Sequence, residues 1–294
     1  MERVPYGATQ LVVSRLGLGC GGLGDVNLTE AEAERLVLGA VDLGITFFDT
    51  ARSYGLAEER LGRILASRRD GVVLSTKGGY AAEGAEDWTP AAITRGIDQA
   101  CSRLRTERID VFHLHSCPVE VMLRDGLVEA LAGAQAAGKI AVAAYAGDND
   151  PLAWAVSCGA FAAVQCSVSI FDQHALRESV PRAAARSMGV IAKRPLGNAP
   201  WRFADRPHHH HDAGPSWDRM RALALSPTPP AWDDLAIRFA AFAPGVACAI
   251  VGTTNPEHLR QAAAHVAKGP LDDDVRLQLA ARYEAVGAEW PGRV

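Results

Sequence analysis

Short apolar runs alternate with longer amphipathic stretches along almost the whole chain. Eight runs of strand length are rich in Val, Ile, Leu, Phe, Ala and Gly, and they lie at 16–20, 45–49, 72–77, 110–115, 140–146, 161–167, 189–193 and 246–252. Apolar runs of this length that alternate with helical patterns are typical of parallel strands buried on both faces.

The stretches between the runs carry signals for helix starts. Thr29 precedes an amphipathic stretch and has Glu32 three residues later, which is a capping-box spacing. Thr89 is followed by Pro90, a residue that is favoured in the first turn of a helix. We expect helices at 29–43, 58–67, 89–104, 123–137, 151–157, 180–188, 233–243 and 271–290, and one that starts near 255.

Eight strand–helix units predict an α/β fold, namely a parallel eight-stranded (β/α)8 TIM barrel formed by residues 1–294 as a single domain. An open doubly wound sheet is the alternative, and eight units favour the closed barrel over it. Residues 1–13 are expected to form an N-terminal hairpin at the bottom of the barrel. Residues 196–232 are expected to form a long loop after the seventh strand, on the catalytic face.

The composition is that of an ordinary globular protein. The 294 residues are 48% hydrophobic and 22% charged, with a net charge of −4, so nothing indicates nucleic acid or an anionic membrane as a partner. The first ten residues have no apolar signal core, and the six cysteines include no CxxC pair. We expect a cytoplasmic protein with reduced thiols, and the oligomeric state is not predicted.

Four polar residues lie where neighbouring predicted strands end, which is the catalytic edge of a barrel. Asp49 ends the second run, Tyr54 lies in the loop that follows, Lys77 ends the third run and His115 ends the fourth. Such a set can reduce a carbonyl: Tyr54 gives the proton, Lys77 lowers its pKa, Asp49 keeps Lys77 charged and His115 polarises the oxygen. His113 lies on the same side of its strand, but His115 is nearer the strand's end.

Taken together, the motifs resemble the aldo-keto reductase family. The matching stretches are GITFFDTARSYG (44–55), STK (75–77), DVFHLHS (110–116), VQC (164–166), KRPLG (193–197) and GTTNPEHL (252–259). The successive spacings of 5, 23 and 38 residues from Asp49 through Tyr54 and Lys77 to His115 are the most specific part. The resemblance implies an NAD(P)H-dependent reductase of aldehydes or ketones, or the reverse alcohol dehydrogenase, acting on a small-molecule carbonyl or alcohol.

The resemblance also implies a nicotinamide cofactor that lies extended across the barrel mouth. Gln165 would contact the carboxamide, and the segment 193–197 would run past the nicotinamide and the pyrophosphate. The turn that opens the last helix would hold the adenosine phosphate, because a helix N-terminus favours anions. The implied cofactor-binding residues are Gln165, Lys193, Arg194, Leu196, Gly252, Thr253, Thr254, His258 and Gln261. NADP(H) is favoured over NAD(H).

The cofactor segments depart from the family pattern, whereas the four proton-transfer residues do not. Ala146 stands where the family has a serine that bonds the carboxamide, and Lys193 stands where many members have a stacking tyrosine. His258 replaces an arginine that is common in members preferring the 2′-phosphate. The histidines at 208–211 lack the spacing of a defined zinc site, so we predict no metal.

Two alternatives stay open. Lys193 at a strand end could form a Schiff base, as in aldolases. The departure at Ala146 leaves room for a nucleotide-binding regulatory barrel that turns over little substrate.

Overall fold

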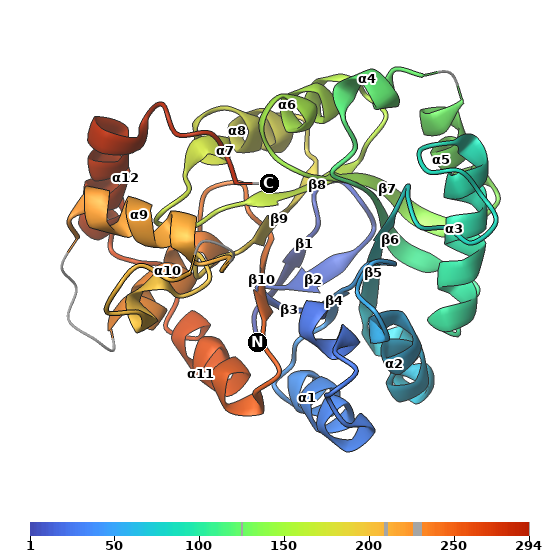
Figure 1. Ribbon diagram of the computed structural model, residues 1–294, viewed down its shortest axis with the longest axis horizontal. Coiled ribbons are helices and arrows are strands. Elements are labelled where there is room, and N and C mark those ends of the chain that lie inside the picture. Colours follow the sequence, from blue (N-terminus) through green and yellow to red (C-terminus); the bar gives the residue numbers. More distant parts are fainter. Residues whose placement is uncertain (125, 209–210, 226–230, 294) are drawn as a thin grey trace.

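Eight parallel strands form a closed barrel in the computed structural model, which describes residues 1–124, 126–208, 211–225 and 231–293 (Figure 1). The predicted (β/α)8 fold class is therefore confirmed. Each strand pairs with the next along the chain, and the last pairs with the first. The strands are β3 (Leu16–Gly19), β4 (Phe47–Asp49), β5 (Val73–Gly78), β6 (Ile109–His115), β7 (Ile140–Ala146), β8 (Ala163–Ser167), β9 (Gly189–Lys193) and β10 (Cys248–Gly252).

Helices surround the barrel, as Figure 1 shows. They are α1 (Glu30–Asp42), α2 (Ala57–Ile64), α3 (Pro90–Arg103), α4 (Val119–Met122), α5 (Leu127–Ala136), α6 (Asn149–Ser157), α7 (His174–Arg177), α8 (Ser179–Ala185), α10 (Ala231–Ala241) and α11 (Pro256–Val266). The capping box of Thr29 and Glu32 is present, and the Thr89 side chain caps α3 by accepting from the Ala92 amide.

Two predicted helices differ from the observed ones. The helix expected at 58–67 ends at Ile64 and is followed by a 3-10 segment, η2 (Ala66–Gly71). The helix expected at 123–137 is present only as the shorter α5, which begins at Leu127, and α4 ends before the predicted range. Gly126 precedes α5 with a φ of 89°, and a residue in that left-handed conformation cannot continue a helix.

The N-terminal hairpin of β1 (Arg3–Pro5) and β2 (Val12–Ser14) is antiparallel, as expected for residues 1–13. Its Tyr6 is fully buried, with its ring centroid 6.1 Å from that of Phe47 inside the barrel. A Cβ at Gly189 would lie 2.4 Å from the Tyr6 ring, so only glycine allows this approach. The hairpin thereby closes the end of the barrel opposite the catalytic edge.

The connection after β9 is not a bare loop. Its described part contains η3 (Pro200–Arg202) and α9 (Gly214–Leu223), and α9 packs against α12 (Asp273–Gly287). After α12 the chain returns across the barrel mouth, and its end lies near the centre of Figure 1. Within the described ranges, no helix combines the length and the apolarity that a membrane crossing requires.

Candidate active site

Lys77 and Asp49 form a buried ion pair at the ends of the adjacent strands β5 and β4. The Lys77 Nζ donates to Asp49 Oδ2 at 2.5 Å and to the Thr50 carbonyl at 2.8 Å. Both side chains are only 2–3% exposed. Burial is the largest single influence and lowers the pKa of Lys77, but Asp49, Tyr54 and Cys20 together hold that pKa above its ordinary value. Lys77 is therefore a permanent cation at this site.

The other oxygen of Asp49 is also fully engaged. Asp49 Oδ1 accepts from Ser75 Oγ at 2.8 Å and from Gln165 Nε2 at 3.0 Å. Because the Ser75 hydroxyl gives its hydrogen to Asp49, it must accept from His113 Nε2, which lies 3.1 Å away. Burial lowers the pKa of His113 to about 4, so the ring is neutral and carries its proton on Nε2. His113 thus supports the carboxylate from behind and does not reach the mouth.

Tyr54 lies in the loop after β4, beside the ion pair. The Lys77 Nζ is 5.2 Å from the centroid of its ring, and the His115 ring meets it edge-on at 6.0 Å. Among the described residues nothing hydrogen-bonds the Tyr54 hydroxyl. Lys77 is the largest single influence and lowers the pKa of Tyr54, but burial, Asp49 and Tyr80 together raise it above its ordinary value. The phenol therefore keeps its proton at neutral pH, and Lys77 acts on it through space, without a hydrogen bond.

Tyr80 is a site residue that the sequence reasoning missed. Its hydroxyl lies 2.8 Å from His115 Nδ1, and the two rings stack with centroids 5.5 Å apart. Trp88 packs against Tyr80, also at 5.5 Å. Burial, followed by the charge on Lys77, lowers the pKa of His115 to about 3, so the imidazole is neutral. The Tyr80 hydroxyl can also donate to Ser53 Oγ, which lies 3.2 Å away. When it donates instead to the nearer Nδ1, the only proton of the His115 ring sits on Nε2 and can be donated to a ligand.

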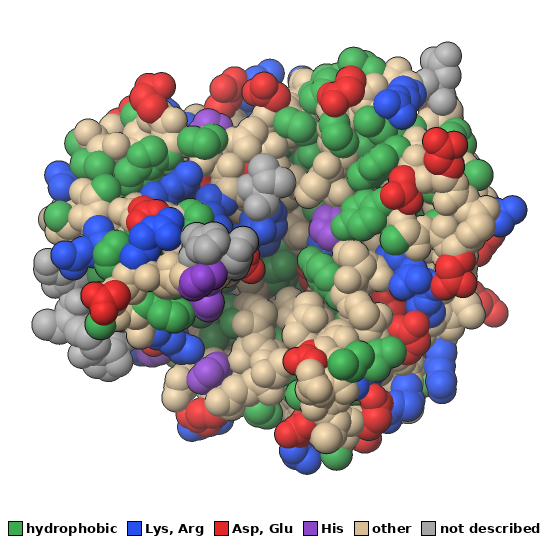
Figure 2. All heavy atoms as spheres, in the orientation of Figure 1, with side chains coloured by type: hydrophobic (Ala, Val, Ile, Leu, Met, Phe, Trp, Pro, Cys, Tyr) green, Lys and Arg blue, Asp and Glu red, His purple; other side chains and the backbone are tan. Residues whose placement is uncertain are grey.

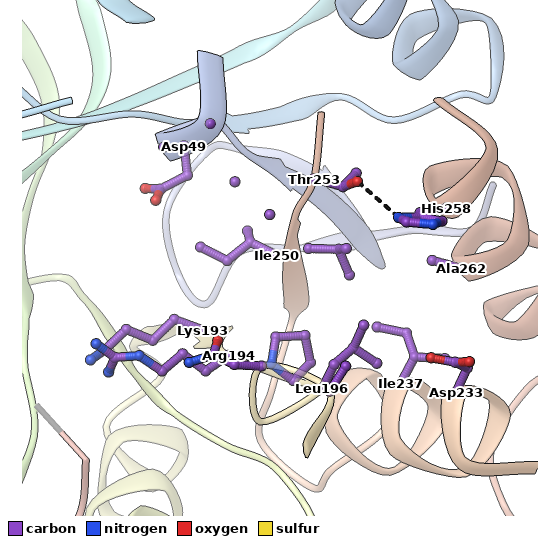
Figure 3. Close-up of a pocket in the computed structure, with 18 of the residues that line it drawn as sticks. Asp49, Lys193, Arg194, Leu196, Asp233, Ile237, Ile250, Thr253, His258 and Ala262 are labelled. Carbon is purple, nitrogen blue, oxygen red and sulfur yellow. Dashed lines mark hydrogen bonds between the residues drawn. The ribbon is translucent and has the colours of Figure 1, made fainter. Parts of the chain in front are cut away.

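A cleft of about 470 Å³ leads from this cluster to the start of α11. In Figure 3, Asp49 faces Lys193 and Arg194 at one end, and His258 and Ala262 lie at the other. Eight of the nine predicted cofactor-binding residues line the cleft: Gln165, Lys193, Arg194, Leu196, Gly252, Thr253, His258 and Gln261. The ninth, Thr254, is exposed and lies against Gly22, outside this lining.

The α11 end of the cleft offers a polar helix start. The Asn255 side chain caps α11 by accepting from the Glu257 amide at 2.9 Å, and Thr253 Oγ1 lies 3.4 Å from His258 Nδ1. Arg202 and Asp233 also line the cleft, although the sequence pattern did not point to either of them. Arg202 belongs to η3 in the long connection and Asp233 to the first turn of α10, and the periodicity that predicts a helix at 233–243 does not show that Asp233 would face the cleft.

Lys193 does not stand free at the opposite end of the cleft. Its Nζ donates to Asp148 Oδ2 at 2.6 Å, and it lies 3.4 Å from the carbonyl of Arg293, in the C-terminal tail. The Arg194 Nη1 donates to the same carbonyl at 2.9 Å and to Ser167 Oγ at 3.1 Å. The tail thus bridges the ends of β8 and β9.

The described residues contain no cluster of three or more His, Cys, Asp or Glu with metal-site geometry. His209 and His210 of the histidine run lie outside the described residues. His211 packs its ring against Phe203 at 4.9 Å.

Comparison with known proteins agrees with this geometry. A sequence model described as the Aldo/keto reductase family matches residues 15–283. The chain is 28% identical over 208 residues to an uncharacterized oxidoreductase of Bacillus subtilis, and the aligned region covers 67% of this chain and 65% of that protein. It is 35% identical over 122 residues to L-galactose dehydrogenase of Arabidopsis thaliana, which covers 39% of this chain and 38% of that protein. The matched part is thus less than two thirds of either relative.

The structural match is more extensive. A Pseudomonas aeruginosa protein assigned to the aldo-keto reductases superposes with a TM-score of 0.73 and 28% identity, over 90% of this chain and 95% of that one. Because the family model spans nearly the whole barrel, the chain belongs to the aldo/keto reductase family.

Proposed function

We propose that this protein is an NAD(P)H-dependent oxidoreductase that reduces an aldehyde or a ketone, or oxidises the corresponding alcohol. One observation carries the proposal: Tyr54, whose hydroxyl has no hydrogen-bond partner in the described part of the chain, stands beside a buried Lys77–Asp49 pair and a neutral His115 at one end of a long cleft. This is the set of groups that carbonyl reduction requires.

The cleft fits an extended nicotinamide cofactor, which supplies the hydride when it is bound. The amide nitrogen of Gln165 donates to Asp49. Its amide oxygen has no hydrogen-bond partner among the described residues and can therefore accept from a carboxamide. The alkyl chain of Lys193 can form the floor of the cleft, because its ammonium group is paired with Asp148. At the other end, the start of α11 with Thr253 and His258 suits a phosphate.

Four residues divide the work at the reacting carbonyl. The His115 Nε2–H donates to the carbonyl oxygen, which polarises the bond and fixes its orientation. As negative charge develops on that oxygen, the Tyr54 hydroxyl transfers its proton to it. The fixed charge of Lys77 stabilises the resulting phenolate through space, and Asp49 keeps that charge in place. In the reverse direction, Tyr54 accepts the alcohol proton.

For the cofactor we propose NADP(H) over NAD(H). The support is His258 and Arg202, two basic side chains that line the cleft, together with the Thr253 hydroxyl beside His258. Asp233 lines the same cleft, and its carboxylate would repel a second phosphate. We therefore expect the preference for NADP(H) over NAD(H) to be moderate. Six free cysteines fit a reducing cytoplasm, which we keep as the proposed location.

The Schiff-base alternative has less support. A lysine nucleophile must be a free amine, yet the Lys193 Nζ is 2.6 Å from Asp148, whose side chain is only 1% exposed. That pairing favours the charged form, although burial acts in the opposite direction and lowers the pKa of Lys193.

The test is oxidation of NADPH and of NADH against a panel of aldehydes and ketones, with the dissociation constant of each cofactor measured in parallel. We expect tight cofactor binding and carbonyl-dependent oxidation. Cofactor binding without turnover of any carbonyl would favour the regulatory barrel. Trapping of Lys193 by borohydride with a carbonyl compound would favour the aldolase.

A further inference from the structure

Arg194 has a half-free guanidinium at the catalytic end of the cleft. Its Nη1 is used for Ser167 Oγ and for the Arg293 carbonyl. Its Nε and Nη2 have no hydrogen-bond partner among the described residues, and neither nitrogen is sealed off from solvent. Nε and Nη2 form one edge of the planar fork, with two parallel N–H bonds. That edge has the geometry of bidentate carboxylate and phosphate recognition.

The guanidinium of Arg194 has no acidic partner within ion-pair distance in the described part of the chain. Two basic neighbours do have acidic partners: Lys193 pairs with Asp148 at 2.6 Å, and Arg219 lies 3.7 Å from Asp172. A partly buried arginine without a paired carboxylate is unusual, because taking its charge out of water costs free energy that hydrogen bonds to neutral groups offset only in part.

Like charges gather around Arg194. The cations are Lys193, Arg194, Arg219 and Arg293, and they face the carboxylates of Asp148, Asp172 and Asp212. Burial, followed by the charges on Arg194 and Arg219, lowers the pKa of Arg293, so this group of side chains is short of negative charge. Figure 2 shows basic side chains along the side of the central hollow that α9 borders.

The backbone holds Arg194 in a costly conformation. Its φ is 54°, in the left-handed region that disfavours side chains, and a non-glycine residue held there costs about 1–3 kcal/mol. Strain of this kind persists where the surrounding structure fixes a side chain for a purpose. Here the tail carbonyl and Ser167 fix it.

Arg194 also lies close to the reacting group. It lines the same cleft as Tyr54, and its positive charge is among the influences that lower the pKa of Tyr54. An anion bound to the free edge of Arg194 would therefore lie near the carbonyl that Tyr54 protonates.

We propose that Arg194 is a specificity-determining residue that binds an anionic group of the substrate. On the basis of the proposed reductase function, the preferred substrates are short aldehydes or ketones that carry a carboxylate or a phosphate a few bonds from the carbonyl. The chemistry shared by both is an oxyanion that can accept two parallel N–H bonds. The competing occupant is the pyrophosphate of the cofactor, which would use the same edge but would not discriminate between substrates.

The experiment compares matched carbonyl pairs in the full-length enzyme. Succinic semialdehyde is paired with butyraldehyde, and glyceraldehyde 3-phosphate with glyceraldehyde, each assayed for kcat/KM with saturating cofactor. We expect the wild type to prefer the anionic member of at least one pair, and that pair tells carboxylate from phosphate. Arg194→Gln should lower the anionic-to-neutral ratio by about 10–100-fold, the range expected for a charge-assisted bidentate contact.

Two further variants keep the result interpretable. Arg194→Lys retains the charge but loses the fork, so it should restore only part of the ratio, and it also guards against a misfolded glutamine variant. Arg206→Gln removes an arginine of the same connection that pairs with Asp218 and does not line the cleft, and it should leave the ratio unchanged.

Three outcomes would overturn the proposal, and they can be told apart. A wild-type ratio near one for both pairs would mean that Arg194 does not select substrates. Equal losses on anionic and neutral substrates in Arg194→Gln, together with weaker cofactor binding, would assign Arg194 to the pyrophosphate. Failure to oxidise cofactor with any of the four carbonyls would refute the proposed reductase function itself.

Discussion

The buried pair of Lys77 and Asp49 gives a prediction whose size can be worked out. Asp49→Asn keeps the shape of the side chain but removes the only carboxylate that contacts Lys77 among the described residues. Leaving Lys77 charged and unpaired would cost about 3–5 kcal/mol. Neutralising it at about pH 7 would cost roughly 4.6 kcal/mol, from about 3.4 pKa units at about 1.36 kcal/mol each. The two routes have similar costs, so we expect Asp49→Asn to lose about 3–5 kcal/mol of unfolding free energy.

The pH dependence distinguishes this explanation from simple loss of packing. In the wild type the pKa of Lys77 is raised, so the stability it contributes is fully present below its unfolded pKa and is lost only at alkaline pH. In Asp49→Asn the folded pKa falls below the unfolded one, so the unfolded state binds one more proton. The stability of the variant should then rise by about 1.4 kcal/mol for each pH unit between the lowered folded pKa and about 10.

Urea unfolding, followed by tryptophan fluorescence at about pH 7 and about pH 9, measures both effects, and subtracting the wild type cancels the other ionisable groups. Ser75→Ala is the matched control, because it removes one hydrogen bond to Asp49 but no charge, and its deficit should not change with pH. A deficit for Asp49→Asn below about 1 kcal/mol, or one that does not shrink at the higher pH, would contradict this electrostatic reasoning.

Three further predictions concern the mouth of the barrel. Tyr80→Phe keeps the stacked ring but removes the hydroxyl on His115 Nδ1, so kcat for reduction should fall by about 3–10-fold and the 15N shifts of His115 should show mixed tautomers. An unchanged tautomer with unchanged kcat would remove Tyr80 from the mechanism. The reduction rate should be flat from about pH 5 to about pH 9, because the pKa of His115 is lowered to about 3 and that of Tyr54 is raised; a limb near about 6.5 would contradict this. His258→Arg should tighten NADPH relative to NADH by roughly tenfold in a dissociation-constant titration, and an unchanged ratio would locate the 2′-phosphate elsewhere.

The barrel could be predicted because its signals are local. An apolar run predicts each strand, and the capping residues Thr29 and Thr89 locate two helix starts within a few residues. The partly wrong prediction at 123–137 has a local cause of another kind, since apolar periodicity continues through Gly126 while the backbone there turns left-handed.

The convergence of the candidate site residues could be predicted because a barrel brings the ends of adjacent strands together, so the proximity of Asp49, Lys77 and His115 follows from sequence order alone. Contacts between segments that are distant in the sequence could not be predicted. The bond from Gln165 to Asp49 joins residues 116 apart, and the contact of Arg194 with Arg293 depends on the path of the chain after α12. The contact of Tyr80 with His115 could not be predicted either, because the sequence of a loop does not indicate which ring its tyrosine will contact.

The most direct test of the proposed mechanism is Tyr54→Phe, measured as kcat/KM for carbonyl reduction together with the cofactor dissociation constant. Loss of the hydroxyl removes the proton donor but leaves the ring beside Lys77 and His115. We expect reduction to fall by about 100-fold or more, in line with the contribution of a positioned general acid, while cofactor affinity changes by less than about twofold. Wild-type reduction by Tyr54→Phe would show that the proton comes from another group.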